Sequence, residues 1–171
     1  MQKNRTAYTR ALVFSAICSA LSVILGKLLQ IPVGNSVRIS FESLPILFAS
    51  LTLGGVWGAA TGLVADLVGC LIMAYEVNPF ITLGAVLIGV IPALFKVKSA
   101  RFTSVFLAVL VSHAIGNMCV KSFGLYLYYG TPWPMLLLRV AVSFVAAVLE
   151  SVILFNCLNS GFFHLCKGER V

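Results

Sequence analysis

The sequence predicts an all-α protein, an integral membrane bundle of six transmembrane helices, in which residues 1–171 form a single domain. Hydrophobic residues make up 60% of the chain and charged residues only 10%. Charged residues are about a quarter of an ordinary soluble domain, so this chain has too few to cover a water-facing surface. The mean hydropathy of +1.05 agrees with a surface that faces lipid.

Six apolar segments are separated by polar or turn-forming residues. A helix needs about 20 apolar residues to cross the hydrocarbon core, with a range of about 17 to 25. Glycine and proline mark the breaks, at Gly54-Gly55, before Pro79 and after Gly130. The predicted spans are 11–30, 42–55, 57–74, 80–95, 102–129 and 133–158.

The positive residues predict the orientation of the chain. Six spans put both termini on one side of the membrane, and only Arg38 falls in a loop on the other side. Cytoplasmic loops carry an excess of Lys and Arg, so we expect a multi-pass protein of the plasma membrane with both termini in the cytoplasm. The residues on the cytoplasmic side are Lys3, Arg5, Arg10, Lys96, Lys98, Arg101, Lys167 and Arg170.

Several functional classes are excluded by composition and motifs. The cations gather at the ends of apolar runs and form no basic cluster interleaved with aromatics, which argues against nucleic-acid binding. The five cysteines form no C-x-x-C pair, so no disulfide framework or metal site is predicted. The chain lacks G-x-x-x-x-G-K-[ST], H-E-x-x-H and G-x-S-x-G. We therefore expect no ATPase or other enzyme activity, no catalytic residues and no cofactor.

Ionisable residues at membrane depth are the best functional indicators, because each costs about 2.5 to 3.5 kcal/mol to insert. They are Glu42, Asp66, His113, Lys121, Arg139 and Glu150. His113, Asn117 and Lys121 are spaced by four and share one helix face. Polar residues from different spans converge on the outer half of the bundle. They predict a pocket that is open to the outside and that offers cations to an anionic ligand. These residues are Arg38, Glu42, Asn78, Asn117, Lys121 and Arg139.

Each ionisable residue also has a purely structural interpretation. Lys121 and Arg139 can extend to the outer headgroups, and Glu42 can cap the second span. His113 is expected to pack in the bundle, Asp66 to form a hydrogen bond between helices and Glu150 to reach the inner interface.

Small residues line the first span. Ala11, Ser15 and Ser19 are spaced by four, and Ala16 and Ala20 form an A-x-x-x-A motif. Small residues let a second helix approach closely, and that helix belongs either to this bundle or to a partner protein. Glycines at 54, 58 and 62 have the same spacing and predict close packing of the second and third spans.

Three runs of sequence combine with these features: VRISFESLPI at 37–46, GGVWG at 54–58 and GLVADLVG at 62–69. Together with the six short spans and the A-x-x-x-A motif, they make the chain resemble the S components, or substrate-binding subunits, of energy-coupling factor (ECF) vitamin transporters over nearly its whole length. Within this family it is most similar to folate-specific S components, in NPFITLG at 78–84 and in residues 124–139, which include YGTP at 129–132.

The resemblance implies a role and a set of partners. S components bind a vitamin from outside, dock through the first helix onto a transmembrane coupling subunit that carries two ATPase subunits, and topple in the membrane during transport. The resemblance also implies that the 31–41 loop gates the pocket. The implied docking surface consists of Ala11, Ser15, Ala16, Ser19 and Ala20.

Folate suits the candidate residues on chemical grounds. Its pterin ring has amide and amino groups for a carboxylate or amide such as Glu42 or Asn117, and a flat face for an aromatic ring. Its glutamyl tail is a dicarboxylate, which suits cations. The aromatic candidates are Phe80, Tyr128 and Trp133, and the cationic candidates are Arg38, Lys121 and Arg139.

Three hypotheses therefore stand. The first is a vitamin-binding transport subunit, with folate as the expected ligand. The second is a self-sufficient secondary transporter or small channel for a small solute, in which Asp66 and His113 relay protons. The third is a scaffold protein of the lipid bilayer that binds no ligand.

Overall fold

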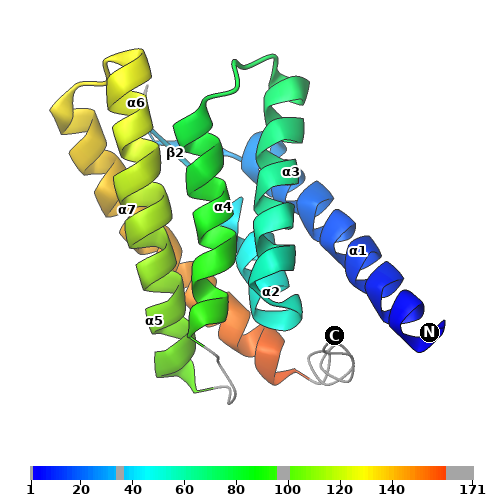
Figure 1. Cartoon of the computed structure of the whole chain (residues 1–171). Coiled ribbons are helices and arrows are strands. Elements are labelled where there is room, and N and C mark those ends of the chain that lie inside the picture. The colour runs from blue at the N-terminus through cyan, green and yellow to red at the C-terminus, as the bar shows by residue number, and fades with distance from the viewer. Residues whose placement is uncertain (1, 34–36, 96–100, 161–171) are drawn as a thin grey trace.

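The computed structural model describes residues 2–33, 37–95 and 101–160, and Figure 1 shows the chain. Two π-helical segments, η1 and η2, continue neighbouring α-helices without a break. The elements are α1 (Gln2–Val23), η1 (Ile24–Leu28), β1 (Ile31–Val33), β2 (Val37–Ile39), α2 (Ser43–Leu53), α3 (Gly55–Met73), α4 (Pro79–Leu94), α5 (Phe102–Ser112), η2 (His113–Lys121), α6 (Ser122–Tyr129) and α7 (Trp133–Asn159).

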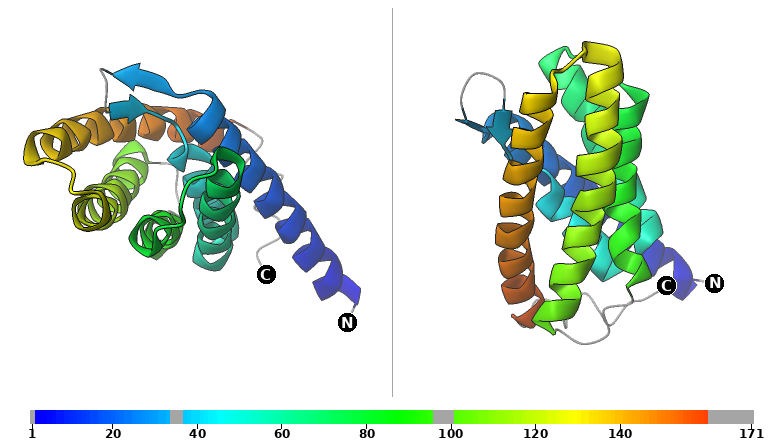
Figure 2. Two further views of the ribbon diagram at one scale, coloured as in Figure 1. Left: turned by 90° about the horizontal axis from the view of Figure 1, so that it is seen from above. Right: turned by 90° about the vertical axis from the view of Figure 1, so that its left-hand side faces the viewer.

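The helical class is confirmed, with one small addition. Strands β1 and β2 form an antiparallel pair in which Ile31 lies opposite Ile39, within the 31–41 segment that is expected to be a loop. Each strand has only three residues, too few to show alternation in the sequence. The pair lies beside α7 in both views of Figure 2.

Within the part of the chain that the structure describes, four helical stretches are long and apolar enough to cross a membrane: Arg5–Leu28, Gly55–Met73, Phe102–Tyr129 and Trp133–Asn159. Helices α2 and α4 are apolar but shorter. At about 1.5 Å per residue, α2 extends about 16 Å, roughly half of the hydrocarbon core. This helix is packed inside the bundle, where Leu47 and Ala49 have no exposed surface.

The division of 42–74 into two helices is confirmed at Gly54. Its φ of 103° lies in a region open to glycine, so α2 and α3 meet with no further linker. The expected close packing of the second and third spans is confirmed at Gly58, and both Gly58 and Gly62 also pack closely on α4. A Cβ at Gly58 would collide with the carbonyl oxygen of Gly89, and one at Gly62 with that of Ala85. Ser50 of α2 also touches Gly58.

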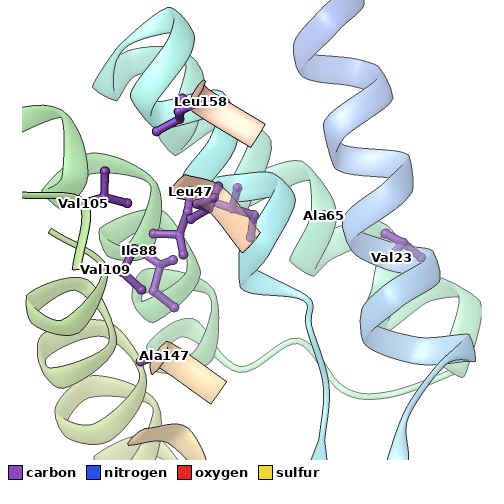
Figure 3. Packing of buried hydrophobic residues seen from close by; sticks show 10 residues of the cluster. Val23, Leu47, Ala65, Ile88, Val105, Val109, Ala147 and Leu158 are labelled. Carbon is purple, nitrogen blue, oxygen red and sulfur yellow. The ribbon is translucent and has the colours of Figure 1, made fainter. Parts of the chain in front are cut away.

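The buried core draws side chains from every long helix, as Figure 3 shows. Its members are Val23, Ile46, Leu47, Ala65, Ile88, Val105, Val109, Ala147, Leu154 and Leu158. The outward faces are apolar as well, with Leu28, Val56, Leu71 and Leu137 strongly exposed. A bundle that is apolar inside and outside is suited to a lipid surrounding.

The ends of the bundle differ in what they carry. The start of α1 and the end of α7 lie at the lower end of Figure 1, together with the turn between α2 and α3. The strand pair, the α3–α4 connection and the α6–α7 connection lie at the upper end. This arrangement separates the end with the described cations Arg5, Arg10 and Arg101 from the end with the strand pair.

Candidate ligand-binding site

A polar cavity of about 350 Å³ lies among η1, α2, α3, α4, η2, α6 and α7. Pockets for small molecules have volumes of about 300 to 1,000 Å³. The charged side chains of its lining are Lys27, Glu42, Asp66, Lys121 and Arg139. Its other polar lining residues are Gln30, Ser40, Ser43, Tyr75, His113, Asn117, Thr131 and Ser143.

Both π-helical segments line this cavity. Lys27 comes from η1, and His113, Asn117 and Lys121 come from η2. The three η2 residues were predicted to share one helix face, and the structure brings all three to the cavity. π-Helical turns are rare and occur frequently at functional sites, and here they contribute two of the three cations.

Glu42 lies between the two lysines. Its Oε1 is 3.5 Å from Lys121 Nζ and its Oε2 is 3.8 Å from Lys27 Nζ. These side chains are only 10 to 17% exposed. The interpretation of Lys121 as a residue that extends to the headgroups is therefore wrong. Glu42 stands at the N-cap of α2 but accepts no capping hydrogen bond, so the capping interpretation is wrong as well.

Glycines make room for these charged side chains. A Cβ at Gly69 would lie 2.7 Å from Lys27 Cε, and one at Gly84 would lie 2.5 Å from Lys121 Cγ. Gly26 faces Glu42 in the same way, with a Cβ position 2.8 Å from Glu42 Cβ. Each charged stem therefore lies directly over a glycine of a neighbouring helix.

Arg139 is held by an amide, and no carboxylate of the described residues forms an ion pair with it. Its Nη2 donates to Asn117 Oδ1 at 3.0 Å, and Asn117 Nδ2 donates to Ser143 Oγ at 3.1 Å. Arg139 Nε is buried without a hydrogen-bond partner in the described part of the chain. Among the described residues the guanidinium forms no ion pair, so its charge is available to a ligand.

His113, which lines the cavity, and Glu150 form a fully buried pair. His113 Nε2 and Glu150 Oε2 are hydrogen-bonded at 2.8 Å, and Ser43 Oγ donates to Glu150 Oε1 at 2.8 Å. The side chains of the pair are 1% and 0% exposed. The expectation that Glu150 reaches the inner interface is therefore wrong, and His113 is not a lone packing residue.

Asp66 forms the expected hydrogen bond between helices, since it accepts from Thr82 Oγ1 at 2.6 Å. It also lines the cavity and a neighbouring cavity of about 400 Å³. The two cavities share Lys27, Asp66 and Tyr75 among their lining residues. The two cavities adjoin near the end of α3, close to the α3–α4 connection.

Four of the predicted ligand-binding residues meet at the cavity: Glu42, Asn117, Lys121 and Arg139. The others that the structure describes do not line it. Asn78 caps α4 by accepting from the Phe80 N–H at 3.0 Å, and Phe80 contacts the ring of Tyr128. Trp133 is 66% exposed and contacts Tyr126. The side chain of Arg38 lies outside the described residues.

The small residues of the first span divide between two faces. Ser15 Oγ lies 2.8 Å from Thr61 Oγ1, Ser19 Oγ donates to the Thr61 carbonyl at 3.3 Å, and Ala11 is also buried. These three residues pack against the bundle itself. Ala16 and Ala20 are exposed, so a docking surface on α1 can include only these two of the five predicted residues.

Sequence reasoning missed Lys27, Gln30 and Tyr75, all of which line the cavity. Lys27 had a usable signal, since it is a charge inside the predicted span 11–30. Tyr75 follows the third span and has no such signal.

The family model for the substrate-specific component of ECF transporters matches residues 10–166. The chain therefore belongs to this family of membrane proteins, which are substrate-binding transport components and not enzymes. No curated protein matches the chain in sequence.

Solved structures of such components have the same fold. FolT bound with folic acid has 23% identity and a TM-score of 0.72, covering 85% of this chain and 92% of that one. The S component of a bacterial ECF transporter has 19% identity and a TM-score of 0.69, with 92% and 98% covered. The S component for biotin from an ECF-type ABC transporter has 21% identity and a TM-score of 0.65, with 97% and 98% covered.

Proposed function

We propose that this chain is a folate-binding S component that captures folate from the outside in the polar cavity. A partner transmembrane coupling subunit with two ATPase subunits then drives its delivery. The observation that carries the proposal is the charge balance of the cavity. Three cations, Lys27, Lys121 and Arg139, face two carboxylates, Glu42 and Asp66. A dicarboxylate such as the glutamyl tail of folate suits this excess of positive charge.

The ring of folate has suitable partners in the same cavity. Asp66 is a carboxylate with one hydrogen bond already formed, which leaves acceptor capacity for ring N–H groups. Tyr75 supplies an aromatic lining residue. The predicted stacking residues Phe80, Tyr128 and Trp133 lie outside the lining, so we assign the ring to the Asp66 and Tyr75 side of the cavity. The likeness to FolT bound with folic acid agrees with this ligand.

The proposed topology has six spans with both termini in the cytoplasm of the cell. Helices α2 and α4 complete the six, and the start of α1 and the end of α7 lie at one end of the bundle (Figure 1). Arg5, Arg10 and Arg101 lie towards that end, as the positive-inside rule requires. Tyr75 and Thr131, which line the cavity, lie close to the opposite end, so the cavity opens outward.

The docking of the coupling subunit is assigned to the exposed face of α1. Ala16 and Ala20 are small, exposed and one turn apart, and they are flanked by the exposed apolar side chains of Ile17 and Leu21. Such a face allows close helix packing in a membrane.

Uptake into liposomes tests the proposal against a secondary transporter. His113 lines the cavity and contacts Glu150, and a buried pair of this kind is the feature that favours a proton relay. We expect the chain alone to bind folic acid without accumulating it, and to accumulate it only when reconstituted with the coupling and ATPase subunits and ATP. Accumulation by the chain alone, abolished when the proton gradient is collapsed, would establish the alternative.

A further inference from the structure

The cavity contains one carboxylate, Glu42, that the described residues hold through cations alone, at longer distances than the hydrogen bonds of the other two carboxylates nearby. Glu150 accepts two hydrogen bonds at 2.8 Å, and Asp66 accepts one at 2.6 Å. Glu42 is 3.5 Å and 3.8 Å from its two lysines, beyond the 2.7 to 2.9 Å, roughly, of a close charge-assisted hydrogen bond. Among the described residues, no hydroxyl or amide group donates to its carboxylate.

The two lysines need a negative partner even when no ligand is present. Lys27 and Lys121 are only 15% and 10% exposed, and unpaired cations in a membrane bundle are costly. Both reach Glu42 from different helices, over Gly69 and Gly84. Glu42 thus occupies the position between the two ammonium groups that a carboxylate of the ligand would take.

We propose that Glu42 is a resident counter-ion that a carboxylate of the ligand displaces from Lys27 and Lys121 on binding. This inference rests on the proposed function and names the chemistry that the lysine pair recognises, which is a carboxylate. Arg139, which forms no direct ion pair among the described residues, binds the second carboxylate of a dicarboxylate ligand. Glu42 is then a specificity-determining residue, because a ligand without an acid group cannot replace it.

Displacement of Glu42 by the ligand and direct contact of Glu42 with the ligand predict opposite effects of the substitution Glu42→Gln on affinity. If Glu42 binds the ring of the ligand, Glu42→Gln weakens binding. If Glu42 competes with the ligand, the same substitution removes the competitor and tightens binding. Gln has the shape of Glu and leaves unchanged the Glu42 carbonyl, which accepts a hydrogen bond from Ser22 at 2.6 Å.

The experiment is calorimetric titration of the purified wild-type and Glu42→Gln chains with folic acid and with its dimethyl ester. The ester has nearly the same size as the acid but lacks the two charges. We expect Glu42→Gln to bind folic acid at least about tenfold more tightly, and to bind the ester no more tightly than the wild type does. Weaker or unchanged binding of folic acid by Glu42→Gln would overturn the inference.

A matched substitution separates displacement from a general change of charge. Asp66→Asn removes the same charge from the same cavity, but Asp66 contacts Thr82 and forms no ion pair with the described lysines. Because Asp66 is also proposed to bind the ring of folate, the affinity of each variant for folic acid is divided by its affinity for the dimethyl ester, which keeps the ring. We expect this acid-to-ester ratio to rise in Glu42→Gln and not in Asp66→Asn. An equal rise in both variants would show that the overall charge of the cavity matters and that displacement does not occur.

Failure of the proposed function is distinguishable from failure of this inference. If the wild-type chain does not bind folic acid, folate is wrong as the ligand, and the same comparison is made with biotin and pantothenate, which each carry a carboxylate. Tighter binding of either by Glu42→Gln would support the inference without folate. Binding of only thiamine or riboflavin, or of none of these vitamins, would overturn it.

Discussion

Replacing Arg139 with Gln tests how the cavity binds the acid tail of its ligand. Gln ends at the position that Arg139 Nε now occupies, so it removes the charge together with the hydrogen bond that Arg139 Nη2 donates to Asn117 Oδ1 at 3.0 Å. Asn117 keeps its hydrogen bond to Ser143. Because Arg139 forms no ion pair with the described residues, no carboxylate is left unpaired and the fold should change little.

The expected loss follows from the strength of one charged contact. A hydrogen bond to a charged group contributes about 1.5 to 3 kcal/mol, and each 1.4 kcal/mol, approximately, is a factor of ten in affinity. Folic acid should therefore bind Arg139→Gln about 10- to 150-fold more weakly than the wild-type chain.

Calorimetric titration with folic acid and its dimethyl ester provides the assay and its control. The ester lacks the charge that Arg139 is proposed to bind, so its affinity should change less than about threefold. An equal loss for acid and ester would refute the reasoning, because it would show that the substitution acts through the shape of the cavity. An unchanged affinity for folic acid would refute it as well.

Three further predictions concern the packing around the cavity and the docking face. A Cβ at Gly84 would lie 2.5 Å from Lys121 Cγ, so the larger side chain of Gly84→Val should displace Lys121 and lower both the melting temperature and the affinity for folic acid. Wild-type values of both would contradict this packing. Glu150→Ala leaves two buried groups, His113 Nε2 and Ser43 Oγ, without their hydrogen-bond partner and should cost about 3 to 5 kcal/mol of stability, against about 1 kcal/mol for Ser43→Ala. Thermal unfolding in detergent checks this order, and equal losses would be inconsistent with it. Ala16→Trp should bind folic acid normally but fail to co-purify with the coupling subunit. Ser15→Trp should not fold, because Ser15 is buried. Normal assembly of Ala16→Trp with the coupling subunit would show that α1 is not the docking face.

Much of the fold was accessible from the sequence because a membrane imposes strong constraints on length and composition. The apolar runs predicted the helices, and Gly54 correctly predicted the break between α2 and α3. Depth along alternating spans predicted that Glu42, Asn117, Lys121 and Arg139 would meet. Depth needs only residue number and span direction, both of which the sequence provides.

The direction in which side chains point around each helix is harder to predict from the sequence. In a soluble helix the apolar face indicates the core, but lipid-facing residues are apolar too, so the periodicity is weak. Tyr128 and Trp133 were therefore placed at the pocket, although both are exposed. Glu150 was placed at the interface, although it is buried. The π-helical segments depend on packing between helices and have no sequence signature, so the sequence could mark Lys27 only as a charge inside a predicted span.

The measurement that tests the central claim most directly is calorimetric titration of the purified wild-type chain, in detergent and without partners, with folic acid. Calorimetry is preferable to tryptophan fluorescence because neither Trp57 nor Trp133 lines the cavity. Saturable binding of one folic acid per chain, at submicromolar concentration and with no ATP present, is the predicted result. The absence of heat with folic acid, from a chain whose fold is verified by its melting transition, would contradict the account.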